Sequence, residues 1–168
     1  GATITYGIDF EGLGLAEQVG TVAHHVLHVA LRHSARQAAL AERLGARFDP
    51  NLFGLAADGI VNQTLEIAGH GLPRPAVLLL DLLAEIGEEA ASPTAALAQW
   101  DSDRLALSLH SDPDRRAKAQ RLVDKLSFRP DVGQSEGAQD APQHSAPDLR
   151  THLTRALQSR RPSRAGVG

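Results

Sequence analysis

The sequence contains no cysteine and no methionine, and aromatic residues make up only 4% of its 168 residues. The lack of cysteine excludes disulfide bonds and thiolate ligands, so a metal site here would have to use histidine and carboxylate side chains. With few aromatic residues, the core must be built from Leu, Val, Ile and Ala, a composition that favours helices over a β-sandwich. Because the chain starts at Gly1 and has no methionine, we expect it to be a fragment of a longer protein.

Excess charge of one sign and long apolar runs are also missing. The formal net charge is −3, which argues against a global basic field that would attract nucleic acid or an anionic membrane surface. No apolar run approaches the roughly 20 residues that a membrane span needs, and no charged start precedes an apolar segment as in a signal peptide. We therefore expect a cytoplasmic protein without a membrane partner, and we do not expect nucleic-acid binding.

The periodicity of apolar residues and the helix-capping signals predict a mainly α fold with one short N-terminal β element. Residues 2–8 alternate in the manner of one short β element, and residues 14–44 carry the pattern of one long helix. Asp49 and Pro50 are suited to begin a second helix, which we expect to end at Gly71. Further helices are predicted at residues 76–89, 93–99, 101–110 and 113–127.

The composition changes sharply after residue 128. We expect residues 1–128 to form one helical domain, followed by a flexible linker at residues 129–147 that is rich in Pro, Gly, Gln, Ser and Asp. Residues 148–168 are predicted to form a C-terminal helix and a basic tail, which we interpret as a solvated end of the chain.

The segment "VAHHVLHVALRH", residues 22–33, places four histidines on the first predicted helix. At about 100° per residue, His24 and His28 lie one turn apart on the same face, where they can present two imidazoles to one metal ion. His25 lies about 100° from His24, beside the pair, and His33 lies about 180° away within an apolar arc. We therefore predict that His33 is a packing residue and not a ligand.

Apolar residues surround these histidines over much of the helix, and Val19, Val22, Val26 and Val29 follow one side of it. This distribution predicts a helix that is buried on most sides. Buried histidines need partners, so two alternatives stay open: a metal site, or histidines that only form hydrogen bonds.

Asp58 on the second predicted helix is the candidate third ligand. It is flanked by apolar residues, where an unpaired carboxylate is costly, and with His24 and His28 it forms a donor set suited to Zn²⁺ with an open position. Asn62 lies one turn further along the helix and can orient a ligand or bond the backbone. The alternatives are that Asp58 caps a helix, pairs with Arg32 or faces solvent.

Three segments together, "VAHHVLHVALRHSAR", "FDPNLFGLAADGIVNQTL" and "GLPRPAVLLL", resemble a known family. It is the zincin-type metallopeptidase domain that precedes a von Willebrand factor A-like domain in many bacterial proteins, and the resemblance covers about residues 1–90. The family typically has an HEvxHxxxxH helix and then a helix with an AaDxxxN core. The resemblance implies His24, His28 and Asp58 as ligands of Zn²⁺, with Asn62 as a supporting residue. Arg32, which is near His25 on the helical wheel, is a further candidate for a supporting role.

The sequence departs from this family at His25, where the family carries its catalytic glutamate. In zincins that glutamate takes a proton from the attacking water and later delivers it to the leaving amine. A neutral imidazole can act as a base, but its length and shape differ, and it can instead coordinate the metal. The sequence also contains Glu17 and Glu66, which cannot be placed relative to the site.

The resemblance therefore implies a mainly α fold of the α+β zincin-like class. It predicts a metal-binding domain with impaired catalysis that acts by binding a protein or peptide. Two alternatives stay open: a metal-free helical interaction module, and an active metallohydrolase that uses His25 as its base. The family context also makes an ATPase of the MoxR type a candidate partner.

Overall fold

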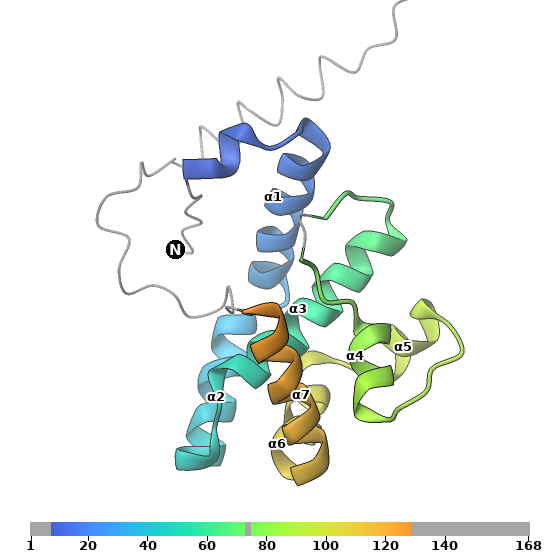
Figure 1. Cartoon of the computed structure of the whole chain (residues 1–168). Coiled ribbons are helices and arrows are strands. Elements are labelled where there is room, and N and C mark those ends of the chain that lie inside the picture. Colours follow the sequence, from blue (N-terminus) through green and yellow to red (C-terminus); the bar gives the residue numbers. More distant parts are fainter. Residues whose placement is uncertain (1–7, 73–74, 129–168) are drawn as a thin grey trace, which may run out of the picture. The chain divides into compact units, whose positions relative to one another are not determined.

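Seven α-helices follow one another in the part of the chain that the structure, a computed structural model, describes: residues 8–72 and 75–128 (Figure 1). They are α1 Leu15–Ala30, α2 His33–Leu44, α3 Pro50–Ile67, α4 Leu79–Ile86, α5 Pro93–Gln99, α6 Ser102–Ser111 and α7 Pro113–Leu126. Two short 3₁₀ helices, η1 Ile8–Gly12 and η2 Gly45–Arg47, complete the described elements. These residues contain no strand, so the prediction of a mainly α fold is confirmed.

Several predicted elements lie outside the described residues. The β element at residues 2–8 is one of them, except that Ile8 begins η1. The linker at 129–147 and the C-terminal helix and tail at 148–168 also lie outside. The predicted domain boundary at residue 128 therefore stays a prediction.

Helix α3 lies at the centre of the described helices and packs against each of the other six (Figure 1). Its sequence explains this position, because apolar residues occur on every side of it, and a helix that is apolar all round is a buried one. Leu52, Phe53, Leu55, Ala56 and Ala57 are fully buried. Every residue that α3 contributes to a site is therefore held in the most densely surrounded element.

The ends of α3 show how its capping signals act. The Asp49 side chain accepts a hydrogen bond from the Asn51 backbone N–H at 2.9 Å, and Pro50 occupies the first turn, as predicted. The helix ends at Ile67, earlier than the predicted Gly71, because Gly69 adopts a left-handed conformation with φ of 75°.

The prediction of one helix over residues 14–44 is wrong, because Leu31 and Arg32 separate α1 from α2. Arg32 adopts a left-handed backbone with φ of 56°, which L-residues other than glycine seldom do. No glycine or proline marks this break in the sequence. The break turns the chain so that α2 packs on both α1 and α3, with Leu40 and His33 as its buried residues.

Helix α1 is buried along one side only. Its buried residues are Gly20, His24 and His28, which follow one another at one-turn intervals, whereas Val26 and Val29 are each 47% exposed. The prediction of a helix that is buried on most sides is therefore wrong. A Cβ atom on Gly20 would lie only 1.7 Å from the Gly71 carbonyl oxygen, so the missing side chain allows α1 to approach that turn.

Helix α4 is shorter than the predicted 76–89, because residues 76–78 are not helical. The Asn62 side-chain amide donates to the Val77 carbonyl at 2.9 Å, and the Gln63 side-chain oxygen accepts from the Leu80 N–H at 3.1 Å. Two neighbouring amides of α3 therefore hold this segment in place. The helices α5, α6 and α7 occur within a residue of their predicted positions.

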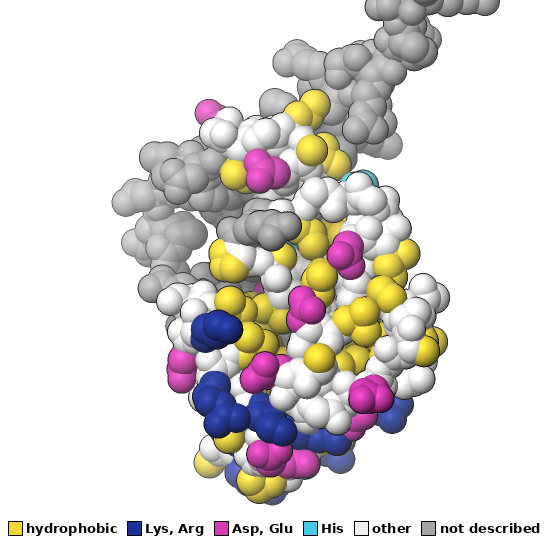
Figure 2. Space-filling view, turned by 45° about the vertical axis from the view of Figure 1, so that its right-hand side comes forward, with side chains coloured by type: hydrophobic (Ala, Val, Ile, Leu, Met, Phe, Trp, Pro, Cys, Tyr) yellow, Lys and Arg dark blue, Asp and Glu magenta, His cyan; other side chains and the backbone are white. Residues whose placement is uncertain are grey.

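Charged side chains of both signs lie among one another on the face shown in Figure 2. Arg36 pairs with Asp103 at 3.0 Å and Lys118 pairs with Asp114 at 2.8 Å. Such exposed pairs contribute little to stability. None of the helices in the described part of the chain is long and apolar enough to cross a membrane.

Candidate metal centre

Three predicted ligands, His24, His28 and Asp58, converge between α1 and α3. One ligand atom of each lies within 4.8 Å of the other two, and all three residues are buried. The Nε2 atoms of His24 and His28 are 2.9 Å apart, and His28 Nε2 is 3.3 Å from Asp58 Oδ1. A tetrahedral zinc ion with bonds of about 2.0–2.2 Å holds its ligand atoms roughly 3.3 Å apart. The spacing of these atoms is therefore close to that of a zinc ligand set.

The Asp58 carboxylate gives an independent sign that the group is suited to a cation. Its Oδ1 atom is buried and has no hydrogen-bond partner in the described part of the chain. The contact to His28 Nε2 is an ion pair only while His28 is protonated. A buried carboxylate oxygen without a partner is costly, and a divalent cation would supply both charge and a bond. The residues therefore fit a divalent metal with two imidazole ligands and one carboxylate ligand.

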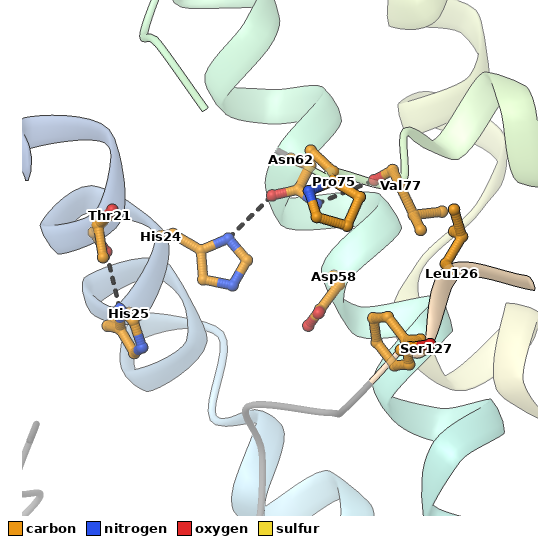
Figure 3. A pocket seen from close by; sticks show the side chains of 11 residues that line it. Thr21, His24, His25, Asp58, Asn62, Pro75, Val77, Leu126 and Ser127 are labelled. Carbon is orange, nitrogen blue, oxygen red and sulfur yellow. Dashed lines mark hydrogen bonds between the residues drawn. The ribbon is translucent and has the colours of Figure 1, made fainter. Parts of the chain in front are cut away.

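Asn62 orients the ring of His24. From the sequence, Asn62 is predicted to be a supporting residue that can orient a ligand or bond the backbone. His24 Nδ1 donates to Asn62 Oδ1 at 2.9 Å, and Asn62 Nδ2 donates to the Val77 carbonyl (Figure 3). A carbonyl only accepts, so this bond determines which end of the amide faces His24. A neutral His24 ring with its proton on Nδ1 has its lone pair on Nε2, the atom near His28. Such outer hydrogen bonds fix the tautomer of a metal-binding histidine.

His33 contacts the second histidine, which the helical wheel did not predict. Its Nδ1 lies 2.9 Å from His28 Nδ1, its side chain is 1% exposed, and its ring meets Phe53 edge-on. The prediction that His33 faces away from the pair is wrong because the break at Arg32 returns the chain toward His28. The last histidine of the family's HEvxHxxxxH pattern is the signal in the sequence that marks this position.

Burial, together with the charges of His28, Arg36 and His24, lowers the pKa of His33 to about 4. His33 is therefore a neutral imidazole at pH 7, with one ring nitrogen that donates and one that accepts.

His25 lies beside His24, His28 and Asp58 and is not part of the group that their ligand atoms form. Its Nδ1 donates to the Thr21 carbonyl at 2.8 Å, and its ring centre is 5.5 Å from that of His24. Figure 3 shows His24 pointing toward Asn62 and Asp58, whereas His25 is held against its own helix at Thr21. The neutral ring then has its lone pair on Nε2.

The comparison with known proteins agrees with this geometry. A family model described as "Putative metallopeptidase domain" matches residues 1–165. The chain belongs to this family. No curated protein and no solved structure matches the chain closely enough to count as similar. The match extends well beyond residues 1–90, where the quoted motifs lie, so family membership applies to nearly all of the sequence.

In this member of the family, the remaining charged candidates, which are Arg32, Glu17 and Glu66, lie outside the group of His24, His28 and Asp58. Arg32 is exposed at the start of α2 and is not among the residues that line the cleft beside the histidines. Glu17 accepts from the Gly14 N–H at 3.2 Å, and Glu66 accepts from the Gln63 side chain at 2.5 Å. Of the described residues that line the cleft, Asp58 is the only carboxylate.

A cleft of about 200 Å³ opens beside the ligand group (Figure 3). Helices α1 and α3 supply its polar side. The segment that precedes α4 and the end of α7 supply mostly apolar residues. The lining residues are Thr21, His24, His25, Asp58, Asn62, Pro75, Ala76, Val77, Leu126, Ser127 and Phe128.

Proposed function

We propose that this chain is a zinc-binding member of the metallopeptidase family that binds a protein or peptide in its cleft, with impaired hydrolysis. The observation that carries the proposal is the convergence of two buried imidazoles on a buried carboxylate oxygen that has no hydrogen-bond partner among the described residues. His24, His28 and Asp58 would hold the metal. When bound, Zn²⁺ supplies Lewis-acid chemistry that polarises a carbonyl group.

The size and lining of the cleft favour one apolar side chain of a peptide as its occupant. An apolar cavity of about 150 Å³ accommodates a benzene molecule, whereas pockets for drug-sized ligands measure roughly 300–1,000 Å³. The cleft, at about 200 Å³, is close to the smaller of these sizes. Pro75, Val77, Leu126 and Phe128 give it apolar walls. A peptide carbonyl near the metal would therefore be flanked by an apolar residue.

Impaired hydrolysis is proposed from the residue at position 25. The sequence resemblance places the family's general-base glutamate there, and this chain has a histidine whose Nδ1 is bound to Thr21. Glu17 and Glu66 are bound elsewhere, and Asp58 is needed as a ligand. No carboxylate of the described cleft lining is therefore left to act as the base.

The first test is the metal content of the purified chain. We expect one zinc ion per chain, lost in His24→Ala and in His28→Ala. His70→Ala is the matched control, since His70 is exposed and lies outside the cleft lining. A wild type that stays folded and takes up no Zn²⁺ would contradict the proposal and favour a metal-free helical interaction module.

The second test restores the family residue. We expect His25→Glu to gain chelator-sensitive hydrolysis of a denatured protein substrate, because a carboxylate base is then placed beside the metal. An equally folded His25→Glu variant that binds Zn²⁺ and hydrolyses nothing would show that more than this base is missing.

An active metallohydrolase is the second candidate, because His25 lines the cleft and an imidazole can act as a general base. This candidate predicts that the wild type hydrolyses peptides and that His25→Ala abolishes the activity. Hydrolysis that His25→Ala leaves unchanged would exclude His25 as the base.

The resemblance also supports three wider proposals. It favours a MoxR-type ATPase as the protein partner and a von Willebrand factor A-like domain as a neighbour of this one. The lack of cysteine is consistent with a cytoplasmic location. Affinity capture with the full chain and a purified MoxR-type ATPase would test the partner directly.

A further inference from the structure

Three imidazoles and one amide form a continuous chain of contacts through the metal centre. His33 Nδ1 meets His28 Nδ1, His28 Nε2 meets His24 Nε2, and His24 Nδ1 meets Asn62 Oδ1, each at 2.9 Å. Asn62 Nδ2 then donates to the Val77 carbonyl, also at 2.9 Å. Each of these distances is that of a hydrogen bond, so one hydrogen atom lies between each pair of atoms.

The carbonyl of Val77 determines the direction of the whole chain when the rings are neutral. It only accepts, so Asn62 presents its oxygen to His24, and His24 has its proton on Nδ1. His24 Nε2 is then an acceptor, which requires the proton of His28 to be on Nε2. His28 Nδ1 is consequently an acceptor as well, and His33 must donate to it from Nδ1.

A metal ion needs the opposite arrangement at His28. Both His24 Nε2 and His28 Nε2 must offer lone pairs to the cation. His24 already does so, but His28 must move its proton to Nδ1. Its Nδ1 then becomes a donor toward His33, so His33 Nδ1 must accept.

We propose that His33 is a positioning residue that changes from donor to acceptor at Nδ1 when His28 binds a divalent cation. This inference rests on the proposed metal site. The protons balance: His33 passes its Nδ1 proton to His28 Nδ1, His28 loses its Nε2 proton to solvent, and His33 Nε2 takes up one proton. Each ring stays neutral before and after, and no net proton is released.

An imidazole suits this position because a neutral ring has one donor and one acceptor that can exchange places. A side chain without this property would leave a buried polar atom of His28 unpaired in one of the two states, which is costly. The competing arrangement is a protonated His28 that donates to both neighbours and pairs with Asp58.

The direct test is the tautomer of each ring in the full chain labelled with ¹⁵N-histidine. Long-range ¹H–¹⁵N spectra are recorded above the ordinary pKa of histidine, with and without Zn²⁺. On adding Zn²⁺, we expect the proton of His28 to change from Nε2 to Nδ1 and the proton of His33 to change from Nδ1 to Nε2. His24 keeps its Nδ1 proton and is the internal control. Protons on both His28 nitrogens without metal, or a His33 tautomer that Zn²⁺ leaves unchanged, would overturn the proposal.

Two variants separate this role from packing. In His33→Asn, the side-chain oxygen or nitrogen takes the place of Nδ1 and can accept or donate after the amide turns. In His33→Leu, neither is possible. We expect His33→Leu to weaken Zn²⁺ binding about 10–100-fold, as the loss of an outer partner does, and His33→Asn to stay within several-fold of wild type.

A packing role alone would give the reverse order, because His33 is 1% exposed and Leu fills an apolar site better than Asn does. Equal affinity of His33→Leu and wild type would overturn the proposal. A wild type that binds no Zn²⁺ would overturn the proposed function and this exchange together. A wild type that binds Zn²⁺ without a change at His33 would overturn only the exchange.

Discussion

The Asp58 side chain has opposite effects on the stability of the metal-free fold and on the proposed metal binding. It lies in the middle of the most buried helix, it is 5% exposed, and its Oδ1 atom has no hydrogen bond from any described residue. Such a group destabilises the metal-free fold. The same carboxylate would complete the proposed ligand set, so we infer that its cost is offset only when a cation is bound.

These two roles predict opposite effects of Asp58→Asn on stability and affinity. We expect the metal-free variant to be more stable than the metal-free wild type by about 1 kcal/mol, because a neutral amide replaces an unpaired buried charge. Zinc affinity should fall by more than the roughly 10–100-fold that the loss of an outer partner costs. Urea unfolding and zinc titration measure the two effects.

Asp124→Asn is the control for this substitution, since Asp124 is an exposed carboxylate of α7 and both quantities should stay unchanged. A metal-free Asp58→Asn variant less stable than wild type would instead indicate that protonated His28 holds the carboxylate.

At the scale of elements, the approach of α1 to the turn after α3 depends on Gly20. A Cβ there would lie 1.7 Å from the Gly71 carbonyl oxygen, well inside any real contact. Gly20→Ala should therefore displace α1, at a cost of about 1–3 kcal/mol. The higher helix propensity of alanine offsets about 1 kcal/mol of this cost, so the free energy of unfolding should fall by up to about 2 kcal/mol. Because His24 lies one turn further along α1, zinc affinity should fall too.

Gly12→Ala is the matched control, because no atom lies within 4 Å of the added Cβ and that glycine has no positive φ. Thermal unfolding and zinc titration of both variants check the prediction. A Gly20→Ala protein with wild-type affinity would show that α1 can shift without moving His24.

The junction of α1 and α2 depends on the backbone of Arg32 and not on its charge. Its left-handed conformation, with φ of 56°, costs roughly 1–2 kcal/mol for an L-residue, and glycine avoids this cost while gaining freedom in the unfolded chain. Arg32→Gly should therefore match wild type or exceed it by up to about 1 kcal/mol, with unchanged zinc affinity.

Arg32→Ala removes the charge and keeps the strain, so it should not exceed wild type in stability. Urea unfolding of both variants tests this. Weaker zinc binding in both would indicate that the Arg32 charge supports the site after all.

At the scale of the whole molecule, metal binding and folding are linked because α3 contributes both the core and the site. The proposed ligands on α1 and α3 meet only when these helices pack. Free Zn²⁺ at 100 times its dissociation constant would stabilise the fold by about 2.7 kcal/mol, and a chelator should lower the melting temperature by about 10 °C. His24→Ala should show no response to either. A wild type whose melting temperature is unchanged by the chelator would contradict the proposed coupling between metal binding and folding.

The sequence by itself determined two pairs of neighbouring side chains, because each pair depends on spacing within a single helix. Residues four apart share a helix face, so His24 and His28 had to be neighbours, and so had Asp58 and Asn62. The caps of α3, α5 and α7 were also predictable, since each begins with an Asp or Ser followed by a proline in its first turn.

Only the tertiary structure decided which face of α1 is buried and where His33 lies. Apolar residues occur over much of the circumference of α1, but its buried residues are Gly20, His24 and His28, on the side that approaches Gly71. No local signal at Leu31 and Arg32 ends a helix. The left-handed turn at Arg32 persists because α2 packs against α3. The periodicity of nearby residues does not predict stabilisation that comes from residues distant in the sequence. That turn brings His33 to His28, so that the pair of His24 and His28 becomes a chain of three histidines.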